Sequence, residues 1–226
     1  MNEQIITHEF RDKTFYFNNT ITAQILIEEI FSDNYGVIAK DIPFKAGDII
    51  LDIGANEGMF SIMMAKLYPM VRVIALEPVP FTYYHLIKNK ELNKCGNIDT
   101  YNVGVGKPGQ HTISLVTNKS KESGGSTAFC TFNPEAHEMM EVGLVSLDDA
   151  FDLYGIDRCR LLKIDVEGSE YDILYPSTVL GRVDSLVIEV HGNRRLDYMA
   201  RRMDGLVTWL CDRTEVIRAE FCRMAE

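Results

Sequence analysis

Acidic side chains mark the ends of four short apolar runs, DIILDI, VRVIAL, CRLLKI and SLVIEV, and a histidine follows the last of them. Carboxylates and imidazoles can accept a proton, bind hydroxyl groups or attract a cationic ligand. If the runs are parallel strands of one sheet, their carboxyl ends meet at one edge, where such sheets bind ligands. We therefore expect one site containing Asp52, Glu77, Asp165, Glu167, Glu189 and His191.

The first run leads into a glycine loop, Asp52-Ile-Gly54-Ala55-Asn56-Glu57-Gly58. Glycine permits a tight turn and lets a ligand approach the backbone closely. The pattern differs from the dinucleotide fingerprint G-x-G-x-x-G, and a carboxylate at Asp52 would repel a pyrophosphate but attract a cation. Glu77 follows about 20 residues later, where an acidic side chain can bind a ribose diol. S-adenosylmethionine, which carries a sulfonium, an ammonium and a ribose but no phosphate, fits this combination.

The elements that position these residues alternate between strand and helix patterns. Apolar runs typical of buried strands occupy 48–53, 71–76, 98–103, 159–164 and 185–190. Helical spacing occupies 21–32, 57–67, 80–93, 146–155 and 169–175. Thr20 and Ser146 are the expected N-caps, with Asp149 at the capping-box position after Ser146. This alternation predicts an α/β fold with a mostly parallel central sheet and helices on both faces.

Additional strands are expected outside this alternation. Residues 10–17 alternate like a short hairpin strand, and 111–117 predicts an extra strand before a polar loop at 118–127. After a helix near 194–203, the runs GLVTWL and EVIRAEF are expected to form a closing antiparallel hairpin. We expect a single domain over 1–226, with an N-terminal cap or lid at 1–35, a cofactor-binding core at 36–192 and a C-terminal helix with closing strands at 193–226.

Five segments together resemble a known family. LDIGANEGMFSIMMAK (51–66) and VIALEPVP (73–80) resemble the first two motifs of class I S-adenosylmethionine-dependent methyltransferases. LVSLDDAF (144–151), LLKIDVEGSEYDIL (161–174) and LVIEVHG (186–192) resemble the FkbM family, with K-I-D-V-E-G-x-E as the most specific part. The resemblance implies a Rossmann-like enzyme that methylates a hydroxyl or carboxyl of a small molecule, sugar or peptide by in-line displacement.

The resemblance also implies roles for individual residues. Glu77 would hold the ribose hydroxyls, and Asn102 and Val103 would approach the adenine. Glu57 departs from the family pattern, in which small or neutral polar residues are commoner at this position. The full cofactor-binding set that it implies is Asp52, Gly54, Ala55, Asn56, Gly58, Glu77, Pro78, Asn102, Val103, Ser126 and Asp165.

Methyl transfer to a hydroxyl also requires a base. The candidates are Asp165, Glu167, Glu189 and His191. His191 has an ordinary pKa near neutrality, and like-charge repulsion within a carboxylate cluster raises the pKa of one member. Mg²⁺ held by Asp165 and a neighbour is the second option, because the sequence lacks a dedicated carboxylate spacing. No residue is therefore assigned as a metal ligand. Asp165 as a helix cap is the structural alternative.

Composition restricts the partners. The 226 residues carry 33 Asp and Glu against 23 Lys and Arg, a formal charge of −10, which argues against non-specific nucleic-acid binding. No apolar run reaches the roughly 18 residues of a membrane span, and no signal peptide is recognisable. Five scattered cysteines without C-x-x-C indicate a reduced compartment, so we expect a cytoplasmic enzyme without a membrane partner.

Three alternatives remain open at this point. An NAD-dependent oxidoreductase would also use a glycine loop after a strand, and a non-catalytic domain could bind the cofactor or a partner protein. The tail hairpin could pair with a second subunit, which would make a homo-oligomer. The acceptor is expected to contact the termini and the 118–140 segment, because specificity usually lies in loops. The stretch from His137 to Met140, together with the N-terminal helix, could form a lid.

Overall fold

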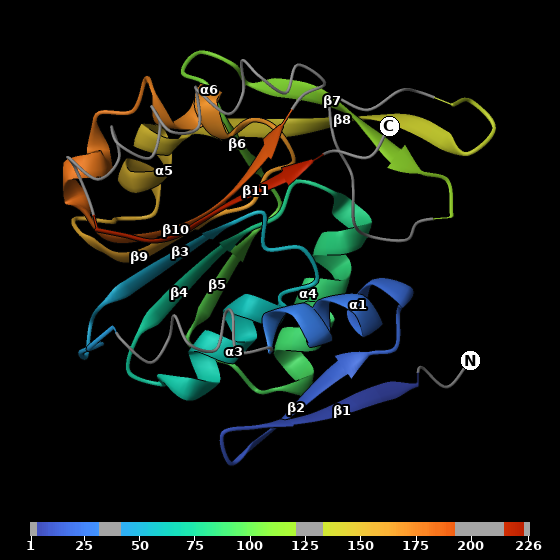
Figure 1. Ribbon diagram of the computed structural model, residues 1–226, viewed down its shortest axis with the longest axis vertical. Helices are drawn as coiled ribbons and strands as arrows, with labels where there is room; N and C mark the ends of the chain where they lie inside the picture. Colours follow the sequence, from blue (N-terminus) through green and yellow to red (C-terminus); the bar gives the residue numbers. More distant parts are fainter. Residues whose placement is uncertain (1–3, 32–41, 121–132, 193–214, 224–226) are drawn as a thin grey trace.

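A six-stranded parallel sheet forms the centre of the molecule (Figure 1). The computed structural model describes residues 4–31, 42–120, 133–192 and 215–223. The strand order is β11-β10-β9-β3-β4-β5, and every neighbouring pair is parallel. The strands are β3 (Ile49–Ile53), β4 (Arg72–Leu76), β5 (Ile98–Tyr101), β9 (Cys159–Ile164), β10 (Val183–Gly192) and β11 (Glu215–Arg223). The predicted α/β fold with a mostly parallel sheet is confirmed.

Helices cover both faces of this sheet, as predicted (Figure 1). Successive residues of β3 face opposite sides of the sheet. Ile50 belongs to the apolar core that includes residues of α1, α3 and α4, whereas Leu51 belongs to the core that includes residues of α5 and α6. The Ser146–Asp149 capping box predicted for α5 is present, and Thr20 caps α1 as expected. The helices are α1 (Ile21–Ile30), α3 (Met59–Leu67), α4 (Pro80–Leu92), α5 (Leu147–Leu153), α6 (Glu170–Leu174) and the 3₁₀ helix η1 (Val179–Arg182).

A second sheet contains two strands that the sequence did not predict. β6 (Gly104–Gly106) runs parallel to β8 (His137–Ser146), and β8 pairs antiparallel with the expected strand β7 (Thr112–Asn118). The segment HEMMEV at the start of β8 is rich in Met and Glu, which favour helices. Pairing with β7 overrides that preference, so the stretch from His137 to Met140 is part of a strand and not a separate lid.

The N-terminal segment forms a third layer against α3 and α4. The expected strand at 10–17 is in fact a hairpin of β1 (Ile5–Phe10) and β2 (Lys13–Asn18), because Arg11 and Asp12 adopt positive φ and turn the chain. Side chains of α3 and α4 bind the hairpin backbone: Lys66 donates to Thr14 O, and Asn93 bonds both backbone groups of Tyr16.

The C-terminal strand extends the main sheet at its edge. The run at 215–221 lies within β11 as predicted, and β11 pairs parallel with β10. The other run of the expected closing hairpin, 205–210, and the helix near 194–203 lie outside the described residues. The antiparallel pairing of the two runs therefore stays a prediction.

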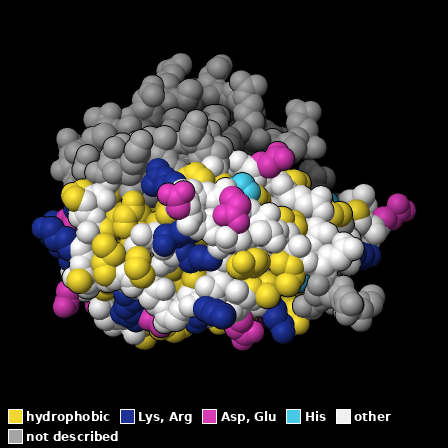
Figure 2. All heavy atoms as spheres, turned by 90° about the horizontal axis from the view of Figure 1, so that it is seen from below, with side chains coloured by type: hydrophobic (Ala, Val, Ile, Leu, Met, Phe, Trp, Pro, Cys, Tyr) yellow, Lys and Arg dark blue, Asp and Glu magenta, His cyan; other side chains and the backbone are white. Residues whose placement is uncertain are grey.

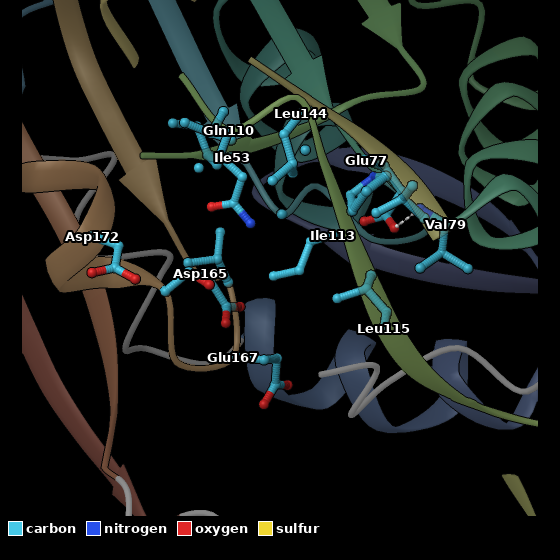
Figure 3. A pocket seen from close by; sticks show the side chains of 18 of the residues that line it. Ile53, Glu77, Val79, Gln110, Ile113, Leu115, Leu144, Asp165, Glu167 and Asp172 are labelled. Atoms are coloured by element: carbon cyan, nitrogen blue, oxygen red, sulfur yellow. Dashed lines mark hydrogen bonds between the residues drawn. The ribbon is translucent and has the colours of Figure 1, made fainter. Parts of the chain in front are cut away.

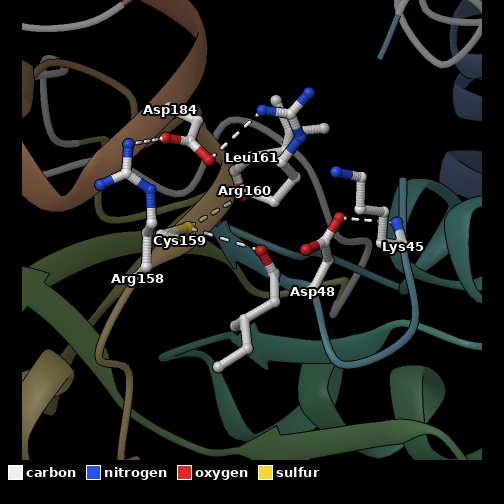
Figure 4. Close-up of polar contacts among 8 residues, drawn as sticks. Lys45, Asp48, Arg158, Cys159, Arg160, Leu161 and Asp184 are labelled. Carbon is white, nitrogen blue, oxygen red and sulfur yellow. Dashed lines mark hydrogen bonds and ion pairs between the residues drawn. The ribbon is translucent and has the colours of Figure 1, made fainter. Parts of the chain in front are cut away.

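The amino ends of the central strands carry a separate polar cluster (Figure 4). Arg158 and Arg160 both pair with Asp184, and the Cys159 thiol lies 3.1 Å from Leu161 O. Burial raises the pKa of the Cys159 thiol to about 12 and that of Cys95 to about 11. Both thiols are therefore protonated at neutral pH and unsuited to nucleophilic attack.

Figure 2 shows one face of the molecule, on which side chains of different kinds are mixed. Basic, acidic and apolar side chains lie next to one another there, without a continuous field of one charge among the described residues. In the part of the chain that the structure describes, no helix has both the length and the apolar character that crossing a bilayer requires.

Candidate active site

A cavity of about 310 Å³ lies at the carboxyl ends of β3, β4 and β9 (Figure 3). This volume is within the range of small-molecule sites, roughly 300–1,000 Å³. One wall consists of strand-end residues, and the opposite wall is apolar and comes from the β7–β8 hairpin. The strand-end residues include Gly54, Asn56, Glu77, Pro78, Asp165 and Glu167, and the apolar ones are Ile113, Leu115, Val142 and Leu144.

Gly54 interlocks the first loop with the end of β9. Its φ is +77°, and a Cβ atom at this position would lie 1.8 Å from the carbonyl oxygen of Asp165. The Asp165 amide in turn donates to Ile53 O at 3.1 Å, and the amides of Gly54 and Ala55 both donate to Leu76 O. Only glycine permits both this backbone conformation and this close approach.

Glu77 projects a buried carboxylate into the cavity. Its Oε2 accepts from the Asn56 amide and its Oε1 from the Val79 amide, both at 2.9 Å. Burial raises the pKa of Glu77 to about 7, although the two backbone hydrogen bonds act in the opposite direction. Each carboxylate oxygen keeps a further lone pair, so the side chain can still accept from two ligand hydroxyls.

Asp165 and Glu167 lie across the cavity from Glu77 (Figure 3). Glu167 has a positive φ of 56°, an uncommon conformation for a side-chain-bearing residue that often marks a functional site. Of the other two predicted bases, Glu189 lies on β10 and does not line the cavity. The side chain of His191 lies outside the described residues, and so does Ser126.

Comparison with known proteins shows which protein family has this sequence pattern. The family model described as the methyltransferase FkbM domain matches residues 52–215, well over half of the chain. The chain belongs to the FkbM family of S-adenosylmethionine-dependent methyltransferases. The oxidoreductase and non-catalytic alternatives are therefore set aside.

Curated relatives cover most of the chain at moderate identity. "31-O-demethyl-FK506 methyltransferase FkbM" of Streptomyces tacrolimicus is 30% identical over 199 residues, 76% of each chain. "Methyltransferase 1" of Beauveria bassiana (strain ARSEF 2860) is 29% identical over 170 residues, 68% of this chain and 67% of the relative. Among solved structures, a precorrin-6y C5,15-methyltransferase from Geobacter metallireducens GS-15 is 17% identical, covers 76% of this chain and 67% of its own, and has a TM-score of 0.43.

In this FkbM-family chain, Asp52 lies beneath the site and not in it. The side chain is fully buried under α3, where Ser61 Oγ donates to Oδ2 at 2.6 Å, and Lys163 Nζ lies 3.3 Å from Oδ1. The expectation that Asp52 lies along the cofactor is therefore not supported by the cavity lining. Lys163 was not among the predicted residues, although a lysine inside the apolar run CRLLKI is itself a signal.

Two residues expected near the adenine, Asn102 and Val103, do not line this FkbM-family pocket. The side-chain amide of Asn102 donates to the carbonyls of Glu77 and Pro78, at 2.9 Å each. Their approach to the adenine stays a prediction, and the β6 strand is part of the cavity lining. A Cβ on Gly104 would lie 2.7 Å from Leu144, so the missing side chain lets the β8 wall close in.

Ala55 and Gly58, which were also in the predicted set, support the loop from outside the cavity. Ala55 is buried in the core beneath α3, and Gly58 caps α3 with a φ of 88°. Among the described residues, no three His, Cys, Asp or Glu side chains converge as a metal site.

The unusual Glu57 connects the loop to the N-terminal layer. Its buried carboxylate accepts from the Thr20 hydroxyl at 2.7 Å, and its carbonyl accepts from the Asn89 amide. Glu57 therefore faces α1 and α4, away from the cavity, and its departure from the family pattern does not alter the ligand wall.

This connection predicts a stability effect without a binding effect. Thr20→Val removes both the N-cap of α1 and one hydrogen bond to Glu57, so the free energy of unfolding should fall by about 2 kcal/mol. Urea unfolding measures this loss, and S-adenosylhomocysteine affinity should stay within about threefold, since Thr20 lies outside the cavity. Thr20→Ser, which keeps the hydroxyl for both bonds, is the matched control and should unfold within about 0.5 kcal/mol of the wild type. Equal losses in the two variants would mean that the Thr20 hydroxyl contributes nothing.

Proposed function

We propose that this enzyme transfers a methyl group to a hydroxyl oxygen of a small-molecule, sugar or peptide acceptor. The observation that carries the proposal is one cavity with Glu77 on one side and the Asp165–Glu167 pair on the other. The name of the Streptomyces tacrolimicus relative specifies methylation at an oxygen, which favours oxygen over nitrogen or carbon here. A carboxyl acceptor is less favoured, because four carboxylates and one lysine line the cavity among the described residues: Glu77, Asp165, Glu167 and Asp172 against Lys107.

The residues present fit S-adenosylmethionine. Glu77 would accept hydrogen bonds from both ribose hydroxyls, and the glycine loop would hold the methionine part close to the backbone at Gly54 and Asn56. When bound, the cofactor supplies an electrophilic methyl group on a positively charged sulfur. Acidic groups around the cavity favour that positive charge.

The chain's own chemical task is orientation and proton removal. The apolar wall of Ile113, Leu115, Val142 and Leu144 excludes water and packs against the bound molecules. A carboxylate of the Asp165–Glu167 pair would accept the proton of the acceptor hydroxyl, which prepares the oxygen to take the methyl group as the carbon–sulfur bond of the cofactor breaks. Holding both reactants in line supplies much of the rate.

The first test is calorimetric titration with S-adenosylhomocysteine, followed by a screen of hydroxyl acceptors and their carboxylate analogues. We expect binding in the micromolar range and methyl transfer to a hydroxyl compound. Absence of binding, or transfer only to carboxylates or amines, would contradict the proposal.

With an acceptor in hand, Asp165→Asn and Glu167→Gln identify the base. Loss of the base should lower kcat by about a hundredfold, because general-base catalysis contributes to the chemical step. The other variant should show a smaller loss. EDTA should leave kcat unchanged, whereas a requirement for Mg²⁺ would assign Asp165 to a metal. If neither variant lowers kcat, the base lies elsewhere, with Glu189 and His191 next in order.

A further inference from the structure

Lys163 is a buried cation placed by strand register beside the site. It lies on β9 directly opposite Asp52 of β3, and the two residues are Cα partners in the parallel ladder. Leu161, two residues earlier, packs in the apolar core beneath α3, and so does Val187, the Cα partner of Lys163 on β10. Lys163 itself is only 4% exposed. An ammonium on such a face is costly unless several acceptors surround it.

Acceptors from two strands and a loop surround its Nζ atom. The Gly54 carbonyl oxygen lies at 2.9 Å, Asp52 Oδ1 at 3.3 Å and Asp165 Oδ2 at 3.4 Å. Gly54 belongs to the glycine loop after β3 and Asp165 follows the end of β9, and both residues line the cavity. The ammonium therefore joins the two segments that also interlock through the missing Cβ of Gly54.

We propose that Lys163 is a positioning residue for cofactor binding, which fixes the Gly54 carbonyl and the Asp165 carboxylate relative to each other. The Asp165 side chain is 29% exposed whereas that of Asp52 is fully buried, so the ammonium binds one carboxylate in the core and one at the cavity. This inference rests on the proposed function, because it concerns the same cavity. It assigns to Lys163 an effect on affinity that is separate from its effect on folding.

The effect of Lys163 on stability can be separated from its effect on cofactor affinity, because the stability effect arises from its pairing with the buried Asp52 carboxylate. Lys163→Met alone leaves the fully buried Asp52 carboxylate without its cation, which is destabilising. Asp52→Asn removes that charge beforehand while keeping an acceptor for Ser61. The informative comparison is therefore Asp52→Asn against the double variant Asp52→Asn/Lys163→Met. Between these two, the ammonium near Gly54 and Asp165 is what changes.

The experiment measures S-adenosylhomocysteine affinity by calorimetry and the unfolding midpoint by heating, on the wild type and both variants. We expect the double variant to melt close to the single variant but to bind at least about tenfold more weakly, the size expected for a lost charged hydrogen bond. Ser61→Ala, which removes the other bond to Asp52 and lies outside the cavity, is the control for stability loss without affinity loss.

Each other outcome is decisive. Equal affinity of the two variants would overturn the inference and leave the proposed function intact. Failure of the double variant to fold under conditions where Asp52→Asn folds would also overturn it, because Lys163 would then act on the fold alone. Absence of binding in the wild type would instead reject the proposed function.

Discussion

Gly54→Ala is expected to abolish S-adenosylhomocysteine binding and to lower the free energy of unfolding by at least about 3 kcal/mol. The added Cβ would lie 1.8 Å from the Asp165 carbonyl oxygen and 2.9 Å from its carbonyl carbon, and both are backbone atoms. Relief requires the end of β9 to move away from the loop, which separates Asp165 from the rest of the cavity. Calorimetry and thermal unfolding measure the two losses.

Gly47→Ala is the matched control for this prediction. Gly47 also has a positive φ, 88°, but a Cβ there would meet nothing within 4 Å. The control therefore carries the conformational cost of alanine at positive φ, about 1–2 kcal/mol, without the collision. It should bind S-adenosylhomocysteine like the wild type. If Gly54→Ala behaves like Gly47→Ala, the close approach of the loop to β9 is not a requirement of the site.

Glu77 should make both stability and cofactor affinity depend on pH, in opposite directions. Burial raises its pKa from the ordinary 4.5 to about 7, so between these values the native state binds more protons than the unfolded state. The free energy of unfolding should therefore fall by about 3 kcal/mol as the pH rises from 4.5 to 7, and this loss is complete above 7. Glu77→Ala should remove this part of the pH dependence.

Cofactor affinity should rise over the same interval, because the ionised carboxylate is the better acceptor for two ribose hydroxyls. Below pH 7 the dissociation constant for S-adenosylhomocysteine should increase by up to about tenfold per pH unit. At pH 6, calorimetry in two buffers of different ionisation enthalpy should show the release of close to one proton on binding. No proton release by the wild type at pH 6 would refute this role for Glu77.

Glu77→Gln is the matched variant for the proton measurement. It cannot ionise, so proton release should disappear. It should also bind more weakly at every pH, since its amide N–H₂ must face either the Asn56 or the Val79 amide, and both are donors. Proton release that persists in this variant would point to another titrating group.

The order of strands and helices and the gathering of acids at one edge followed from the sequence. Apolar runs of five or six residues alternate with helical patterns, and right-handed crossovers between parallel strands bring all their carboxyl ends to the same edge. Glu77, Asp165 and Glu167 were placed in this way, and all three line the cavity. The capping box of Ser146 and Asp149 was also predicted, because the residues that form a helix cap are close together in the chain.

Which covering layer each residue of a strand faces could be assigned only from the tertiary structure. In β3, Ile53 lines the cavity while Asp52 points beneath α3, because successive side chains of a strand face opposite sides. Periodicity tells which residues share a face but not which layer covers that face. The same argument explains Lys163, whose function depends on the register that pairs it with Asp52.

The structures of β8 and β11 depend on pairing between strands that are far apart in the chain. The β8 segment has a helix-favouring composition at its start, and only pairing with β7 and β6 makes it a strand and a cavity wall. The sequence also could not predict whether β11 joins the main sheet parallel or antiparallel, because an apolar run is compatible with both directions. The sequence by itself determined the reaction class and the acidic edge of this enzyme. The tertiary structure decided which of those acids reach the cavity and what closes its other side, since both depend on contacts between segments far apart in the chain.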